Sequence, residues 1–325
     1  MKPAFSVIFL TTLIGTGQGL FLALYTGQLY ALFGLLPKQG ASYYAAGSAL
    51  ALGFLALGLG ASFFHLGRPL RAWRSAAQWR TSWLSREVIV LPALAGLVAL
   101  YGLAHFAGWQ APLLTLPGGY PVDATLLLGG LGTLACFALF LCTGMIYACL
   151  RFLQEWHTPL TVINYTLLGG ASGFLAATAY AAVAAPELGG FFGGWTVVIT
   201  LLAAAGRIAS LVRNARLSPK SNIATAIGVR HPRIVQKSAG FLGGSFNTRE
   251  FFHGGSPALL RSVKWLFLVF AFPAPLALLA AGIALASQTL LFSAFLMQYA
   301  GLIAERWFFF AQANHPQNLY YHAVS

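Results

Sequence analysis

Residues 124–150 read ATLLLGGLGTLACFALFLCTGMIYACL, a stretch of 27 residues without a single charge. A transmembrane helix needs about 20 consecutive, mostly apolar residues, so this stretch is long enough to cross a bilayer. The whole chain has the same character, because 8% of its 325 residues are charged and 58% are hydrophobic. Soluble domains have roughly 25% charged residues. The sequence therefore predicts an all-α integral membrane protein.

Similar apolar stretches lie on both sides of residues 124–150 and are separated by short segments rich in Pro, Gly or charge. Pro273 and Pro275 fall inside one of them and predict a kink. We predict a single polytopic domain over residues 1–325 with about eight transmembrane helices, at residues 5–36, 44–64, 87–106, 124–150, 160–184, 195–212, 265–286 and 290–310.

The positive charge is distributed very unevenly between the two ends of these helices. The 19 Lys and Arg outnumber six Asp and Glu, which gives a net charge of +13. All of these bases except Lys38 fall at one end, many of them in a basic loop at residues 214–262. By the positive-inside rule, this end and both termini are cytoplasmic. Because the bases flank apolar spans, anionic lipid and a protein partner are better candidates than nucleic acid.

Several ionisable residues are predicted to lie at membrane depth near the basic end. Such groups are costly there unless they are paired or hydrated, and they often mark functional sites. Two interpretations stay open: ion pairs that lock helix ends together, or a binding site. The residues, contributed by five distant segments, are His65, Arg86, Glu87, Arg151, Arg207, Glu305 and Arg306.

The residue types favour a quinone as the ligand of such a site. A quinone enters from the lipid and takes up two electrons and two protons, so it needs a hydrogen-bond donor and a route for protons. A histidine such as His65 can donate to a carbonyl oxygen. A carboxylate such as Glu87 can transfer protons. The segment between His65 and Glu87 contains three tryptophans, which could either form a wall of this site or anchor the protein at the membrane interface: Trp73, Trp79 and Trp83.

A haem group is the competing interpretation, and it would need two facing histidines. His65 and His105 are predicted at opposite membrane surfaces, so we expect no haem in this chain. We also expect no metal site. The three cysteines, Cys136, Cys142 and Cys149, show no CxxC spacing and are expected to be packing residues.

A partner-docking surface is predicted beside this site. Arg68, Arg71 and Arg74 are spaced by three and would share one face of a helical turn. Arg249 lies in an aromatic and polar string at residues 246–252, a composition typical of interfaces. The alternative is that these bases only attract anionic lipid.

Two motifs, HLGRP at residues 65–69 and WLSRE at residues 83–87, resemble the DmsC-like membrane anchor subunits of the wider NrfD-like group. The resemblance continues through Arg151 to Trp156 and through Glu305 to Arg306, and it covers the whole chain. It implies a bacterial inner-membrane protein that exchanges electrons between quinone and an iron–sulfur subunit, itself joined to a molybdopterin catalytic subunit. The family's quinone-site histidine and glutamate match His65 and Glu87. The predicted quinone-binding set is His65, Arg86, Glu87, Arg151, Trp156, Arg207 and Glu305.

The opening residues 5–10, the string at 246–252 and residues 307–321 look most like the anchors of cytoplasmic sulfite dehydrogenases. We therefore expect electrons from sulfite, oxidised on a cytoplasmic partner, to reduce ubiquinone or menaquinone. A quinol-oxidising anchor of a DMSO-reductase-type enzyme is the first alternative. An anion transporter that uses Arg86 and Arg207 is the second.

Overall fold

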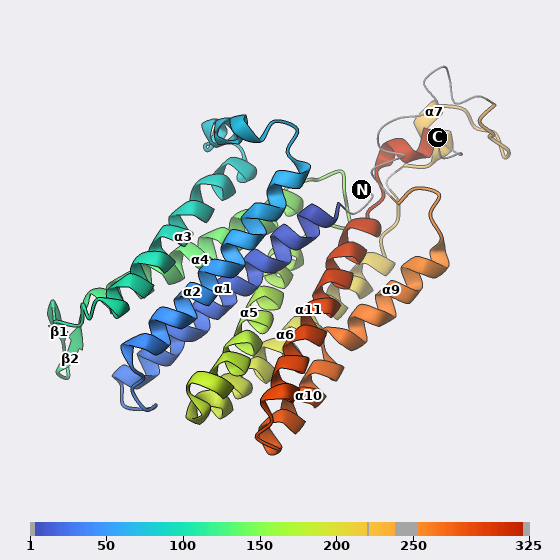
Figure 1. The fold of residues 1–325 in the computed structure, drawn as a ribbon. Coiled ribbons are helices and arrows are strands. Elements are labelled where there is room, and N and C mark those ends of the chain that lie inside the picture. The colour runs from blue at the N-terminus through green and yellow to red at the C-terminus, as the bar shows by residue number, and fades with distance from the viewer. Residues whose placement is uncertain (1–3, 220, 238–251, 321–325) are drawn as a thin grey trace.

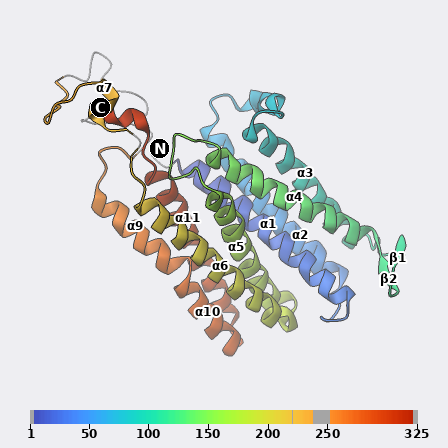
Figure 2. The same ribbon diagram turned by 180° about the vertical axis from the view of Figure 1, so that it is seen from behind.

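The computed structural model describes residues 4–219, 221–237 and 252–320 of the chain, and it is a bundle of long helices (Figures 1 and 2). Successive long helices run in alternating directions through the bundle, except that α10 continues in the direction of α9 (Figure 1). They are α1 (Phe5–Leu32), α2 (Ala41–Ser62), α3 (Trp83–Phe106), α4 (Ala124–Ala148), α5 (Pro159–Ala184), α6 (Gly189–Ala215), α9 (Pro257–Phe270), α10 (Pro273–Ala284) and α11 (Gln288–Ala311).

Short elements lie at the two ends of the bundle. The antiparallel strands β1 (Leu114–Leu116) and β2 (Tyr120–Val122) form a hairpin whose turn contains Gly118 and Gly119, both with positive φ. This hairpin lies at one end, and the start of α1 and the end of α11 lie together at the other (Figure 1). The remaining short elements are η1 (Phe63–His65), η2 (Pro69–Gln78), η3 (Pro186–Leu188), α7 (Ile223–Ile227) and η4 (Pro316–Tyr320).

We call the end with η2 and α7 the basic end.

Seven segments of the described chain are long and apolar enough to span a membrane, with α9 and α10 counted as one. The remaining long helix, α11, has 24 residues and packs in the same bundle, beside α9. Its polar residues Gln298, Glu305 and Arg306 are buried within the protein. They lower the apolar character of α11 without exposing polar groups to lipid.

Polar capping residues set the starts of several helices. Ser82 accepts a hydrogen bond from the backbone N–H of Ser85 at 3.3 Å, which starts α3 at Trp83. Asp123 and Thr158 cap α4 and α5 in the same way. Such caps satisfy backbone donors that the first helical turn leaves free. The span predicted from residue 87 therefore begins earlier, and Glu87 lies in the second turn of α3.

Glycines on both helices bring α1 and α5 into backbone contact. Gly15 and Gly19 on α1 face Gly169 and Gly173 on α5, so each helix contributes two glycines four residues apart. A side-chain carbon added at Gly173 would lie 2.1 Å from the backbone carbonyl carbon of Gly19. Small residues at this spacing let membrane helices pack backbone to backbone. The close approach of α1 and α5 therefore depends on these four glycines.

The predicted kink in the span at residues 265–286 is a break between α9 and α10. α9 ends at Phe270 and α10 begins at Pro273, which cannot donate a backbone hydrogen bond. Gln298 of α11 donates to the carbonyl oxygen of Ala271 at 3.3 Å. Gly301 of α11 packs directly against Ala271, where a side chain would not fit. The break is therefore stabilised by the neighbouring helix.

Candidate functional site

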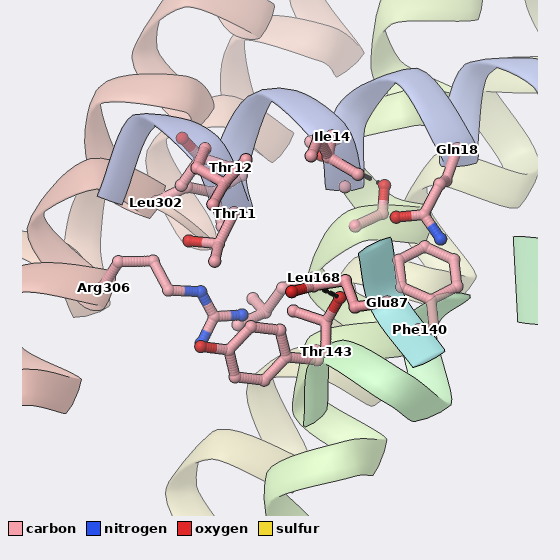
Figure 3. A pocket seen from close by; sticks show the side chains of 15 residues that line it. Thr11, Thr12, Ile14, Gln18, Glu87, Phe140, Thr143, Leu168, Leu302 and Arg306 are labelled. Atoms are coloured by element: carbon pink, nitrogen blue, oxygen red, sulfur yellow. Dashed lines mark hydrogen bonds between the residues drawn. The ribbon is translucent and has the colours of Figure 1, made fainter. Parts of the chain in front are cut away.

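A narrow cavity, here called the inner cavity, lies between α1, α3, α4, α5 and α11 near the basic end (Figure 3). It has room for about one water molecule. Apolar side chains form part of its wall, and polar groups from all five helices face it. The polar side chains that line it are Thr11, Thr12, Gln18, Glu87, Thr143, Tyr165, Ser172 and Arg306.

Glu87 is the carboxylate of this cavity. The hydroxyl of Thr143 on α4 donates a hydrogen bond to Oε1 of Glu87 (Figure 3). The two residues come from neighbouring helices, and the bond fixes the direction in which the carboxyl group points. A carboxyl group beside a water-sized cavity is placed to exchange protons with that water.

Arg306 reaches from α11 towards the same cavity (Figure 3). Its guanidinium carbon lies 3.6 Å from the ring centroid of Tyr165, a cation–π contact. Its Nη1 atom lies 3.3 Å from Oε2 of Glu305. The cation is thus held by a ring on one side and a carboxylate on the other, and it brings positive charge to the cavity that contains Glu87.

Glu305 also pairs with Arg207 on α6. Oε1 of Glu305 lies 2.7 Å from Nε of Arg207, and the Arg207 and Glu305 side chains are 2% and 1% exposed. The rings of Phe267 and Phe308 lie 5.4 Å and 5.7 Å from the Arg207 guanidinium carbon. Removing one member of a buried pair leaves the other charge uncompensated, at a cost of roughly 3–5 kcal/mol. The group Arg207, Glu305 and Arg306 therefore joins α6 to α11 beside the inner cavity.

The other predicted site residues lie away from the inner cavity. His65 is exposed at the end of η1. Arg86 donates to the carbonyl oxygens of Trp79 and Arg80, both at 2.9 Å, so it binds the preceding loop. Of the predicted quinone-binding set, Glu87 lines the inner cavity, whereas His65 and Arg86 do not.

Two further members of the predicted set have other surroundings. Trp156 is buried, donates its indole N–H to the carbonyl oxygen of Phe309 at 2.9 Å, and stacks on that ring at 5.2 Å. These contacts join the 149–158 segment to α11. Arg151 is exposed and lines a separate cavity beyond the helix ends.

The site predicted from the sequence omits several residues that line the inner cavity. Thr11, Gly15 and Gln18 are spaced by four and three residues, so they share one face of the first span. This spacing could have indicated that one face of the first span is not apolar. Thr143 and Tyr165 carry no comparable signal, because single polar residues are common in transmembrane helices.

The predicted docking arginines are exposed on the surface of the basic end. Arg71 and Arg74 lie on η2 and Arg68 directly precedes it. Because a 3₁₀-helix has three residues per turn, Arg71 and Arg74 lie on one face. Arg249 lies outside the described residues, as do residues 246–251 of the aromatic and polar string.

Residues 1–312 of the chain match the family of the DMSO reductase anchor subunit (DmsC). The chain belongs to the DmsC family. As a DmsC-type anchor it is a multi-pass membrane protein that works with catalytic partner subunits. A relative from Allochromatium vinosum, one of the sulfite dehydrogenase subunits of that organism, is 59% identical over 325 residues, which cover 100% of both chains. This DmsC-family anchor is therefore a homologue of a subunit of an oxidoreductase complex.

Proposed function

We propose that this anchor passes electrons from a partner iron–sulfur subunit to membrane quinone in a sulfite-oxidising complex of the bacterial inner membrane. The identity of 59% with a sulfite dehydrogenase subunit supports the sulfite-oxidising partner, which would carry a molybdenum cofactor. The basic end would face the cytoplasm, since positive charge is retained on that side. The partner subunits would then dock from the cytoplasm.

The observation that carries the quinone proposal is the position of Glu87. It lies in the second turn of a membrane-spanning helix, is held by Thr143, and adjoins a cavity with room for water. Reduction of a quinone consumes two protons for every two electrons. A carboxyl group between the membrane and internal water can supply those protons to the carbonyl oxygens of the ring.

The size of the inner cavity limits where the quinone can lie. A quinone ring needs far more room than one water molecule, so the inner cavity is suited to protons and not to the ring. We place the ring on the side of Glu87 facing away from this cavity, at the basic end where His65 and the first turn of α3 lie. Lipid-soluble quinone can reach that side without entering the bundle.

The two alternative functions differ in their support. Quinol oxidation uses the same groups in reverse, so the geometry suits it equally and the sulfite-type relative favours quinone reduction. An anion transporter would need binding charges that are accessible to the anion. Arg207 is paired with Glu305, and Arg86 is bound to loop carbonyls, so neither cation is available for that role.

The test is the variant Glu87→Gln in the purified complex. The amide keeps the volume but cannot release a proton, so quinone reduction should fall at least about tenfold, a modest loss for a general acid–base group. Sulfite oxidation with an artificial dye should persist because it bypasses the anchor. Glu187→Gln is the matched control, because Glu187 is exposed on η3 at the opposite end of the bundle. Wild-type quinone reduction in Glu87→Gln would rule out this role for Glu87.

A further inference from the structure

Two further cavities lie near the inner cavity, and each shares a side chain with the next. The first, here called the middle cavity, lies between α5, α6 and α11 and is about as narrow as the inner cavity. Arg306 lines both the inner and the middle cavity, so it forms part of the wall between them. The middle cavity is lined by Glu155, Thr161, Asn164, Arg207, Ser210, Glu305, Arg306, Phe309 and Gln312.

The middle cavity is surrounded by polar atoms that need hydrogen-bond partners. Oδ1 of Asn164, Nε2 of Gln312 and Nη2 of Arg207 are buried, and none of these three atoms forms a hydrogen bond with the described residues. Buried polar atoms are normally bonded to protein or to ordered water. A polar cavity of this size holds about one water molecule. Water in the middle cavity would satisfy several of these atoms at once.

The second cavity, here called the outer cavity, lies beyond the helix ends at the basic end and has a volume of about 760 Å³. It has room for many water molecules, and its wall includes Arg151, Asn214 and Asn314. Glu155 lines both the outer and the middle cavity. A single carboxyl group thus stands between a wide cavity at the protein surface and the narrow internal one.

The surroundings of Glu155 suit a group that takes up and releases protons. Its Oε1 atom accepts a hydrogen bond from the backbone N–H of Asn314 at 3.3 Å, which fixes its position. Burial raises the pKa of Glu155, so this carboxyl binds a proton more readily than a glutamate in water. It can therefore exchange protons with water on either side.

We propose that Glu155 is the entry point of a proton path that runs through the middle cavity, past Glu305, to Glu87. The proposal rests on the proposed function, because Glu87 needs such a supply only if it delivers protons to quinone. In each cycle two protons move inwards, one after the other, and each ends on a quinone oxygen. A proton passes from outer-cavity water to Glu155, and Glu155 gives it to water in the middle cavity. It then passes the Arg306 side chain to water in the inner cavity and reaches Glu87, which delivers it to a quinone oxygen. The partner subunit supplies the two electrons.

The test compares Glu155→Gln with Glu187→Gln in the full complex. The amide at position 155 blocks proton entry, so quinone reduction should fall at least about fivefold, a modest acid–base effect. The KM for quinone and the dye-linked sulfite oxidation should be unchanged. Formic acid, a small proton carrier that fits the outer cavity, should restore much of the rate. Glu187→Gln should behave as the wild type, with and without formic acid.

A purely structural role for Glu155 predicts a different result. The Glu155 carboxylate accepts a bond from the segment after α11, so its loss could distort the protein, and formic acid would not repair that damage. A wild-type rate in Glu155→Gln, or a slow rate without rescue, overturns the proton path. If Glu87→Gln is slow in the same series, the proposed function survives that failure. Wild-type rates in both variants would remove the proposed function as well.

A second variant tests the path if Glu155→Gln does not assemble. Gln312→Leu keeps a side chain of similar size at the middle cavity but removes its polar group, and it breaks no ion pair. With a leucine there, water in the middle cavity is less stable, so quinone reduction should again slow while dye-linked oxidation persists. An unchanged rate of quinone reduction in Gln312→Leu would contradict a path through the middle cavity.

Discussion

Among the described glycines, Gly173 has the least room for a side chain. Its Cα faces the backbone of Gly19, and an added side-chain carbon would lie 2.1 Å from the Gly19 carbonyl carbon. We expect Gly173→Ala to force α1 and α5 apart and to destabilise the anchor by about 1–3 kcal/mol or more, as overpacking does in protein cores. Thermal unfolding in detergent measures the loss. Gly170→Ala is the control, because there the nearest atom is 3.4 Å away, on Ile199.

Spacing in the sequence predicts some of these residues and not others. The glycines of the first span predict close helix packing, because only small residues allow it. The pairing of Gly19 with Gly173 does not follow from the sequence, since it depends on which helices are neighbours. The same holds for Arg306 on the ring of Tyr165, where the two residues lie far apart in sequence.

The 3₁₀-helix η2 carries two of the predicted docking arginines, and Arg68 directly precedes it. Reversing Arg68, Arg71 and Arg74 to glutamate should release the soluble subunits from washed membranes while the anchor stays inserted. An arginine desolvated in an interface can contribute about 2 kcal/mol or more, whereas one that only attracts lipid contributes about 1 kcal/mol. Immunoblots of the membrane and soluble fractions measure the release.

The comparison variant for this experiment lies in the basic loop. Arg230, Arg233 and Lys237 are also exposed, and reversing them changes the net charge by the same amount. If that variant releases the partners and the η2 variant retains them, docking takes place on the basic loop. If the soluble subunits stay bound in both variants, attraction to anionic lipid remains as the role of these bases.

At the level of elements, the apolar pattern predicts the long helices and misplaces some of their ends. The start of α3 depends on Ser82, whose capping bond places the helix before the two charged residues Arg86 and Glu87. A span predicted from apolar residues stops at charged ones, so the predicted start, residue 87, lies after the observed start at Trp83. The predicted span at residues 290–310 corresponds to α11, where burial of Gln298, Glu305 and Arg306 accounts for the polar content.

For the whole molecule, the charge distribution predicts one orientation in the membrane. In a Cys149→Ser background, Lys38→Cys should react with a membrane-impermeant thiol reagent in intact cells, and Arg71→Cys should react only after lysis. Both positions are exposed, so accessibility to the reagent depends on the side of the membrane. The buried Cys136 and Cys142 should stay unlabelled. The reverse pattern would place the basic end outside the cytoplasm and contradict the docking scheme.

The overall arrangement was more predictable than the site within it. An even number of spans and the positions of the bases predict that α1 begins and α11 ends at one end of the bundle, as Figure 1 shows. The inner cavity could not be predicted, because it depends on how five helices pack against each other. Residue type and predicted depth single out Glu87 as a candidate site residue. Thr143 and Arg306 line the same cavity, but their positions there depend on tertiary contacts that the sequence does not reveal.

The pairing of Arg207 with Glu305 also has a consequence for how the protein is made. During synthesis α6 enters the membrane before α11 exists, and an arginine within a span costs up to roughly 2.5–3.5 kcal/mol, the value at the span's centre on insertion scales. Glu305 compensates that charge only when the last long helix has been translated and packed. A chain truncated before α11 would keep an unpaired cation within the bilayer, a defect that membrane quality-control proteases can recognise. Arg207 thus makes the stability of the earlier helices depend on completion of the chain.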